Sequence, residues 1–205
     1  WKMRKLLNEE LDRLSPQGFK ESKKTPLVIV LDNVRSLNNI GSIFRSADAY
    51  RVEKVYLCGI TAQPPHKDIR KTALGATETI DWEYLEHTID IVNKLNQEGY
   101  TTCAIEQAER SQNLYNFSPA KREKVAIVLG NEVKGVQQEV VDSCKEVIEL
   151  DQFGTKHSLN ISVCAGIVIY DVFNKISLLR EWYYKLTISS IDKTHLRLGI
   201  KTHFH

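Results

Sequence analysis

The sequence predicts an α/β domain in which helices cover both faces of a mostly parallel sheet. Short, continuous apolar runs, typical of strands buried on both faces, alternate with segments of helical character, as residues 27–31 and 37–50 do. Strands joined through helices pair in parallel by right-handed crossovers. With 205 residues, of which 42% are hydrophobic and 26% charged, the chain has the size and composition of one such domain with appendages.

The positions of the strands and helices are predicted from the apolar runs and from the residues that end each element. Residues 2–24 carry leucines at helical spacing among charged residues and predict an amphipathic arm, which Pro16 and Gly18 end. The expected strands are residues 27–31, 55–58, 101–106, 125–129 and 146–150, and the expected helices are residues 37–50, 67–74, 87–98, 137–144 and 157–173. A further helix is expected over residues 178–186. The chain therefore divides into an arm (1–24), a central domain (25–176) and a C-terminal helix and tail (177–205).

The last helix of the central domain is unusually apolar. From Leu159 onward it is apolar on almost every side, with small residues such as Gly166 within it, which predicts a buried helix. Ser158 and Asn160 lie at its start, where short polar side chains bind free N–H groups. A capping role explains Ser158. Asn160 is a candidate site residue, because a buried amide without partners costs about 1–3 kcal/mol.

Several common activities lack their sequence signatures. The chain has no G-x-G dinucleotide fingerprint, and residues 130–135 have the glycine spacing of a P-loop without the Lys-Ser/Thr that must follow. There is no G-x-S-x-G elbow and no H-E-x-x-H helix, which disfavours hydrolases and kinases. His203 and His205 are read as incidental, so no metal is expected.

Composition gives further limits on the partners. The four cysteines never occur as C-x-x-C, which predicts reduced thiols in a cytoplasmic protein. No apolar run approaches about 18 residues, so no membrane segment is expected. The formal net charge of +2 is too small to indicate nucleic acid by itself, and any basic surface would have to be local.

Three polar loops remain as candidate site elements. Residues 38–49 include Asn39, read as a possible helix cap, and Arg45; residues 129–136 follow a strand, and residues 150–160 join the last strand to the buried helix. Ligands bind at the carboxyl ends of parallel strands, where these loops are expected to lie. Taken alone, the first loop is equally well read as a capped helix with a surface arginine.

Together the three loops resemble a known family. The patterns N-x-G-x-x-x-R-x-A (from Asn39), L-G-N-E-x-x-G-V (from Leu129) and S-L-N-x-S-V (from Ser158) are similar to the three motifs of the SpoU/TrmH-type RNA ribose 2'-O-methyltransferases of the SPOUT superfamily, in the same order, over residues 25–176. The resemblance implies a C-terminal trefoil knot, S-adenosylmethionine as cofactor, RNA as substrate, and a homodimer in which each subunit completes the other's site.

The resemblance also implies roles for individual residues. The implied catalytic residues are Arg45, Asn39, Glu132, Ser158 and Asn160. The implied cofactor-binding residues are Leu129, Gly130, Asn131, Gly135, Leu150, Ser158 and Leu159. RNA contacts are expected from Arg45, Lys67, Arg70 and Lys71, together with the arm. Two departures are the sequence Leu-Asp-Gln-Phe from Leu150, where many relatives have Ile-Pro-Met, and the short arm, where many have an RNA-recruiting domain.

The expected reaction is methylation of a ribose 2'-hydroxyl in structured RNA, with tRNA preferred to rRNA. Arg45 is expected first to orient the RNA, since a guanidinium is not an ordinary base at neutral pH. The resemblance implies for it, as a second role, a part in accepting the hydroxyl proton. Glu132 is expected to order its loop or to orient Arg45. Two alternatives stay open: a base-nitrogen RNA methyltransferase on the same fold, and a non-catalytic RNA-binding protein.

Overall fold

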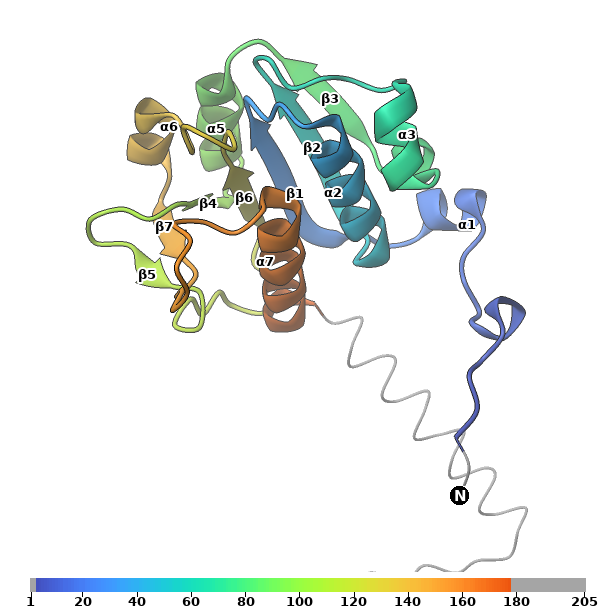
Figure 1. Ribbon diagram of the computed structural model, residues 1–205. Coiled ribbons are helices and arrows are strands. Elements are labelled where there is room, and N and C mark those ends of the chain that lie inside the picture. Colours follow the sequence, from blue (N-terminus) through green and yellow to red (C-terminus); the bar gives the residue numbers. More distant parts are fainter. Residues whose placement is uncertain (1–2, 178–205) are drawn as a thin grey trace, which may run out of the picture.

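A computed structural model describes residues 3–177 of the chain, and it confirms the α/β class (Figure 1). A seven-stranded sheet has the order β3-β2-β1-β6-β4-β7-β5, and every paired strand is parallel to its neighbour. The strands are β1 Thr25–Asp32, β2 Val52–Cys58, β3 Trp82–Leu85, β4 Thr101–Ile105, β5 Gln112–Asn113, β6 Val125–Leu129 and β7 Glu146–Glu149. The helices are η1 Asn8–Glu10, α1 Pro16–Glu21, α2 Leu37–Ala49, α3 Lys67–Ala73, α4 Ala76–Thr79, α5 Thr88–Gln97, α6 Gln138–Ser143 and α7 Ile161–Ile176.

Helices cover both faces of the sheet, as predicted. Alternate residues of β1 point to opposite faces: Leu27 and Ile29 join the core under α2 and α7, whereas Val28 and Val30 join a second core under α5 and α6. Because β1 is buried on both sides, its sequence is apolar without alternation. This is why the central strands could be read from the sequence.

Two strands were missed because they lie at the edges of the sheet. β3 pairs only with β2, and none of its four residues is fully buried, so it has no continuous apolar run. β5 consists of only two residues and pairs with β7. Short, half-exposed edge strands carry little of the hydrophobic signal on which strand prediction depends.

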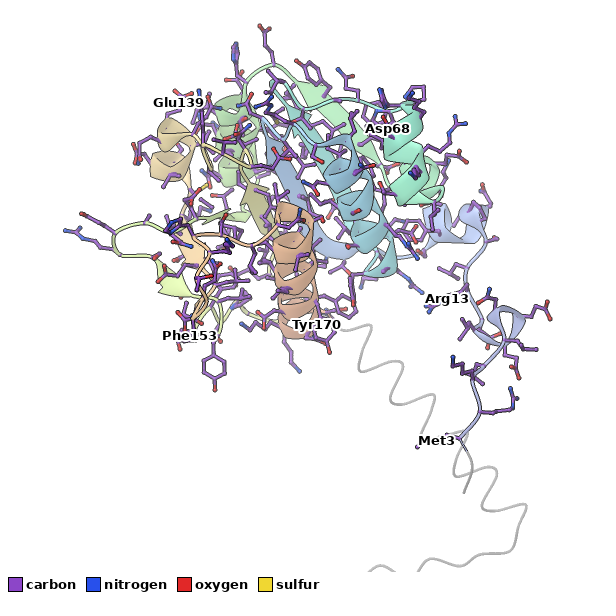
Figure 2. All side chains as sticks on the ribbon, in the orientation of Figure 1. Met3, Arg13, Asp68, Glu139, Phe153 and Tyr170 are labelled. Carbon is purple, nitrogen blue, oxygen red and sulfur yellow. The ribbon has the colours of Figure 1, made fainter. Side chains whose placement is uncertain are left out.

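The prediction for the arm is wrong in one respect. Pro16 begins α1 instead of ending a helix, and the hydroxyl of Ser15 caps it by accepting the N–H of Gly18 at 3.0 Å. Proline suits the first position of a helix because its missing N–H has no partner there. Leu6, Leu7, Leu11 and Leu14 are exposed, and Figure 2 shows Met3 far from the sheet.

The prediction for the buried helix is correct on one side only. α7 packs against α2 and β1 through residues such as Val168 and Val172, which are fully buried. On its other side Val163 is 52% exposed, Ile167 43% and Tyr170 54%. The sequence could not predict that this face is exposed. An apolar helix face that is buried within the chain and one that is left exposed have the same kind of sequence.

The C-terminal predictions fall outside the described part of the chain. The expected helix over residues 178–186 and the histidine pair at 203 and 205 both lie beyond residue 177. Within residues 3–177, no helix is long and apolar enough to cross a membrane, and no three His, Cys, Asp or Glu side chains are grouped as a metal site would require. The knot stays a prediction.

Candidate functional site

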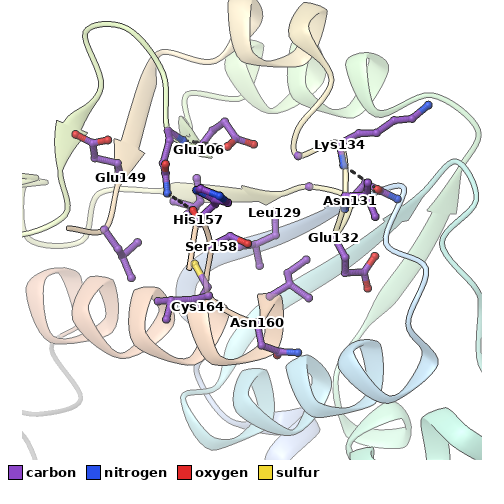
Figure 3. Close-up of a pocket in the computed structure, with 18 of the residues that line it drawn as sticks. Glu106, Leu129, Asn131, Glu132, Lys134, Glu149, His157, Ser158, Asn160 and Cys164 are labelled. Atoms are coloured by element: carbon purple, nitrogen blue, oxygen red, sulfur yellow. Dashed lines mark hydrogen bonds between the residues drawn. The ribbon is translucent and has the colours of Figure 1, made fainter. Parts of the chain in front are cut away.

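A cavity of about 520 Å³ opens at the carboxyl ends of β6, β4 and β7 (Figure 3). Leu129 ends β6, Ile105 ends β4 and Leu150 follows β7, and all three line the cavity. The start of α7 closes its remaining side, where the half-buried Cys164 contributes its thiol. Burial and the nearby Glu106 raise the pKa of this thiol to about 11, so it stays protonated at neutral pH.

The second polar loop forms one wall through a tight backbone turn. Asn131 and Gly135 exchange backbone hydrogen bonds of 3.0 and 2.9 Å, and the side-chain oxygen of Asn131 accepts the N–H groups of Val133 and Lys134. A Cβ on Gly130 would lie 2.1 Å from the backbone of Gly135, so only glycine fits there. The loop therefore presents backbone to the cavity, a surface suited to a flat ligand.

Two residues that the sequence reading missed hold this loop to the third one. The Glu106 carboxylate, directly after β4, accepts the N–H of Val136 at 3.0 Å and the N–H of Gln107 at 3.0 Å. The Gln107 side chain donates to the carbonyl of His157 at 2.9 Å (Figure 3). The sequence contained a signal for both residues. Residues 101–106 are predicted as a strand, and polar residues at the carboxyl end of a parallel strand lie at the same edge of the sheet as the three loops.

A buried carboxylate fixes the far end of the same loop. Asp32, fully buried at the end of β1, accepts both the backbone N–H and the side-chain amide of Gln137 at 2.8 Å. Thr88 and Asn33 also donate to it, at 2.6 and 2.9 Å. A buried carboxylate must be satisfied in this way, and here its partners tie β1, α5 and the loop after β6 together.

Glu132 joins the second loop to the first. Its carboxylate accepts the backbone N–H groups of Arg35 and Ser36, both at 2.9 Å, and the Asn39 side-chain amide at 3.2 Å. Burial alone would raise the pKa of Glu132, but these donors together lower it below its ordinary value. Glu132 therefore orders the start of α2, and in the structure it makes no hydrogen bond to Arg45.

The cap predictions need two corrections. Ser36, not Asn39, caps α2, since its hydroxyl accepts the Asn39 N–H at 3.3 Å. Asn160, not Ser158, caps α7, since its side-chain oxygen accepts the N–H of Ser162 at 2.9 Å. Asn160 is also exposed instead of buried. Sequence could not separate neighbouring polar residues at a helix start, because each is a competent cap.

The side-chain nitrogen of Asn160 extends the network, donating to the Asn39 side-chain oxygen at 3.2 Å. Asn39, Glu132 and Asn160 are thus hydrogen-bonded although each comes from a different predicted motif. The predicted cofactor residues Leu129, Gly130, Asn131, Gly135, Leu150, Ser158 and Leu159 all line the cavity.

Not every predicted residue reaches the cavity. Arg45 is exposed on α2 and does not line it in the single chain. Its neighbour Ser46 faces α7, with its hydroxyl 3.9 Å from where a Cβ of Gly166 would lie. Lys67, Arg70 and Lys71 are exposed on α3, which lies on the other side of α2 from α7 (Figure 1).

Comparison with known proteins agrees with this geometry. The model of the SpoU rRNA Methylase family matches residues 26–170. A Staphylococcus haemolyticus protein assigned to the TrmH family of tRNA/rRNA methyltransferases is 28% identical over 159 residues, which cover 78% of this chain and 63% of that protein. The chain thus spans less than two thirds of the length of this relative.

Two solved structures share the fold. The TrmH/SpoU tRNA modifying enzyme of A. aeolicus superimposes with a TM-score of 0.70 at 22% identity, covering 90% of this chain and 94% of that one. The AdoMet-bound rRNA methyltransferase of Sinorhizobium meliloti gives 0.67 at 25% identity, covering 78% and 60%. Because the family model matches residues 26–170, which is most of the chain, the chain belongs to the SpoU rRNA Methylase family.

Proposed function

We propose that the protein transfers a methyl group from S-adenosylmethionine to a ribose 2'-hydroxyl in structured RNA, with tRNA preferred to rRNA. The observation that carries the proposal is the hydrogen-bonded set Asn39, Glu132 and Asn160 at the edge of the cavity. It joins three loops that are distant in sequence, and these are the loops whose patterns resemble the motifs of the ribose methyltransferases. Reduced cysteines and an RNA substrate are consistent with a cytoplasmic location.

The cavity fits the proposed cofactor in size and in lining. Its volume of about 520 Å³ lies within the roughly 300–1,000 Å³ typical of small-molecule sites. Leu129, Leu150 and Leu159 give it apolar walls, and the backbone around Gly130 can approach an adenine closely. S-adenosylmethionine would supply a methyl group activated by a sulfonium. The S. meliloti relative holds this cofactor.

Arg45 would act on the RNA and not on the cofactor. Its guanidinium has five N–H donors and stays charged, so it can hold the phosphate beside the target ribose in a bidentate manner. Holding the hydroxyl in line with the methyl group can lower the barrier by about 7–11 kcal/mol. Asn39, Asn160 and Ser158 would give neutral hydrogen bonds to the substrate or cofactor.

A second copy of the chain would complete this site. Arg45 does not line the cavity of its own chain. Beside it, an apolar strip lies exposed along α7 and just before its start, formed by Leu159, Val163, Ile167 and Tyr170. Such strips mark interaction surfaces. We therefore propose a homodimer in which Arg45 of one subunit faces the cavity of the other. Lys67 and Lys71 would bind phosphates along α3, and Arg70 would contact the RNA beside them.

We also propose the C-terminal knot. The chain leaves the sheet at β7, beyond β6 and β4, and α7 then returns to pack on β1 and α2. A return across the already formed strands is the path that a threaded C-terminal segment would take.

The function is tested by methyl transfer from labelled S-adenosylmethionine to total tRNA and rRNA, with mass spectrometry of the modified nucleosides. Arg45→Ala should lower turnover at least about a hundredfold and change cofactor affinity by less than about twofold, because it removes a contact made in the transition state. Arg45→Lys should also be impaired, since lysine lacks the planar fork.

Arg122→Ala is the matched control, because Arg122 is exposed near the amino ends of the strands, at the edge opposite the cavity. Near-normal turnover in Arg45→Ala would remove Arg45 from the mechanism. A methylated base in the product would favour the base-nitrogen alternative. Failure to bind S-adenosylmethionine in calorimetry would favour the non-catalytic one.

A further inference from the structure

A second, smaller cavity of about 220 Å³ lies beside α3. In Figure 1, α3 lies on the far side of α2 from α7, whose start lines the first cavity. The loop before α3, α3 itself, α4 and the edge strand β3 form its walls. No proposed step of methyl transfer uses it. We propose that this cavity binds one unpaired nucleobase of the RNA substrate and that guanine fits it best, an inference that rests on the proposed function.

The size and the flat groups of the cavity select a single ring system. About 220 Å³ is below the roughly 300–1,000 Å³ of sites for drug-sized ligands, so one base fits but a whole cofactor does not. Trp82 is half-buried and packs against the core, which holds its indole in place while it lines the cavity. The exposed Arg70 and Pro65 also line it. Unpaired bases stack on aromatic rings and guanidinium planes.

Polar groups in the lining distinguish between bases. Glu78 is an exposed carboxylate that only accepts hydrogen bonds when ionised. Among the four bases, guanine alone has two adjacent donors, N1–H and the 2-amino group, for the two oxygens of this carboxylate. Uracil has a single donor, N3–H, between two carbonyl oxygens. His66 Nδ1 accepts the N–H of Asp68 at 3.2 Å, which leaves Nε2 as the donor of the neutral ring. This donor suits the guanine 6-oxygen.

The cavity is held at a fixed distance from the proposed catalytic helix. Gly41 of α2 lets α3 approach closely, since a Cβ there would lie 2.1 Å from the Thr72 hydroxyl and 2.3 Å from the Ile69 carbonyl. The Thr72 hydroxyl also donates to the Asn38 carbonyl at 3.0 Å, next to Asn39. A base seated here would therefore set which ribose reaches the site that α2 helps to form.

The test is nucleotide binding to the full chain labelled with ¹⁵N at its tryptophan indoles. GMP, AMP, CMP and UMP are titrated separately, and the Trp82 indole signal is identified by its loss in Trp82→Phe. GMP should move this signal at the lowest concentration. Glu78→Gln should weaken GMP at least about tenfold and change UMP by less than about threefold, because only guanine can give both carboxylate oxygens a donor.

Glu86→Gln is the matched control: Glu86 is exposed after β3, outside the cavity, and the change should leave GMP binding as it is. Equal binding of the four nucleotides, no shift of the Trp82 signal, or an unchanged Glu78→Gln would overturn the proposal. S-adenosylmethionine binding and methyl transfer are measured in parallel. A wild-type protein that lacks both refutes the proposed function, whereas one that has both but ignores GMP refutes only the base site.

Discussion

At the scale of single residues, the carboxylate of Glu132 connects the second loop to the first, and we expect the stability of this connection to depend on pH. Its folded-state pKa is lowered, so its contribution to stability is present above the ordinary carboxyl value of 4.5 and is lost as pH falls through the lowered value. Glu132→Gln should therefore reduce the free energy of unfolding at pH 7 by about 1 kcal/mol, because water partly compensates an exposed group.

Urea unfolding at pH 7 and at pH 3 measures this effect. The difference between wild type and Glu132→Gln should be smaller at pH 3 than at pH 7, because the lower pH shifts the wild-type carboxylate toward its protonated form. Glu109→Gln, in an exposed loop, should behave as wild type at both values. A difference that stays constant between the two pH values would show that the charge of Glu132 does not stabilise the loops.

The residues of the candidate site could be predicted from the sequence where they belong to one of the three motifs. Those outside the motifs could not. Asn39, Glu132 and Asn160 were identified, but their mutual hydrogen bonds depend on the tertiary arrangement of three loops. Asp32 and Glu106 were missed, because an acidic residue at the end of a strand is also common on surfaces. Only the structure shows that each satisfies backbone N–H groups of the cavity loop or its end.

At the scale of elements, two helical glycines should respond to alanine in opposite directions. Gly41→Ala places a methyl group against the α3 backbone and should destabilise the fold by about 1–3 kcal/mol through overpacking. Gly166→Ala meets only Ser46 at 3.9 Å and should stabilise α7 by up to about 1 kcal/mol, the difference in helix propensity. Thermal and urea unfolding compare the two variants, and effects of the same sign would contradict the packing of α2 against α3.

The central elements were predictable, and those at the margins were not. β1 and β6 have long apolar runs because neighbouring strands and helices on both sides bury them. The arm has helical leucine spacing, yet residues 3–15 contain only the short turn η1, because the described chain buries none of those leucines. The spacing of apolar residues shows which face of a segment could be buried. Whether that face is buried depends on the tertiary packing.

At the scale of the whole molecule, the exposed strip on α7 predicts an assembly. Ile167→Glu should convert the proposed dimer to monomers in analytical ultracentrifugation and lower methyl transfer in the same proportion, since a charge on a buried apolar interface is costly. Ile60→Glu is the control, because Ile60 is 66% exposed after β2 and lies outside the strip. An Ile167→Glu protein that stays dimeric would place the interface elsewhere.

The sheet order has a consequence for how the protein is made. β1 pairs with β2 on one side and with β6 on the other, so one edge of β1 has no partner until residue 125 and those after it have left the ribosome. At a translation rate of roughly 5–20 residues per second, that edge of β1 stays unpaired for several seconds during synthesis. Unpaired strand edges bind other chains, so a nascent chain stalled before residue 125 should be a chaperone client and prone to aggregate.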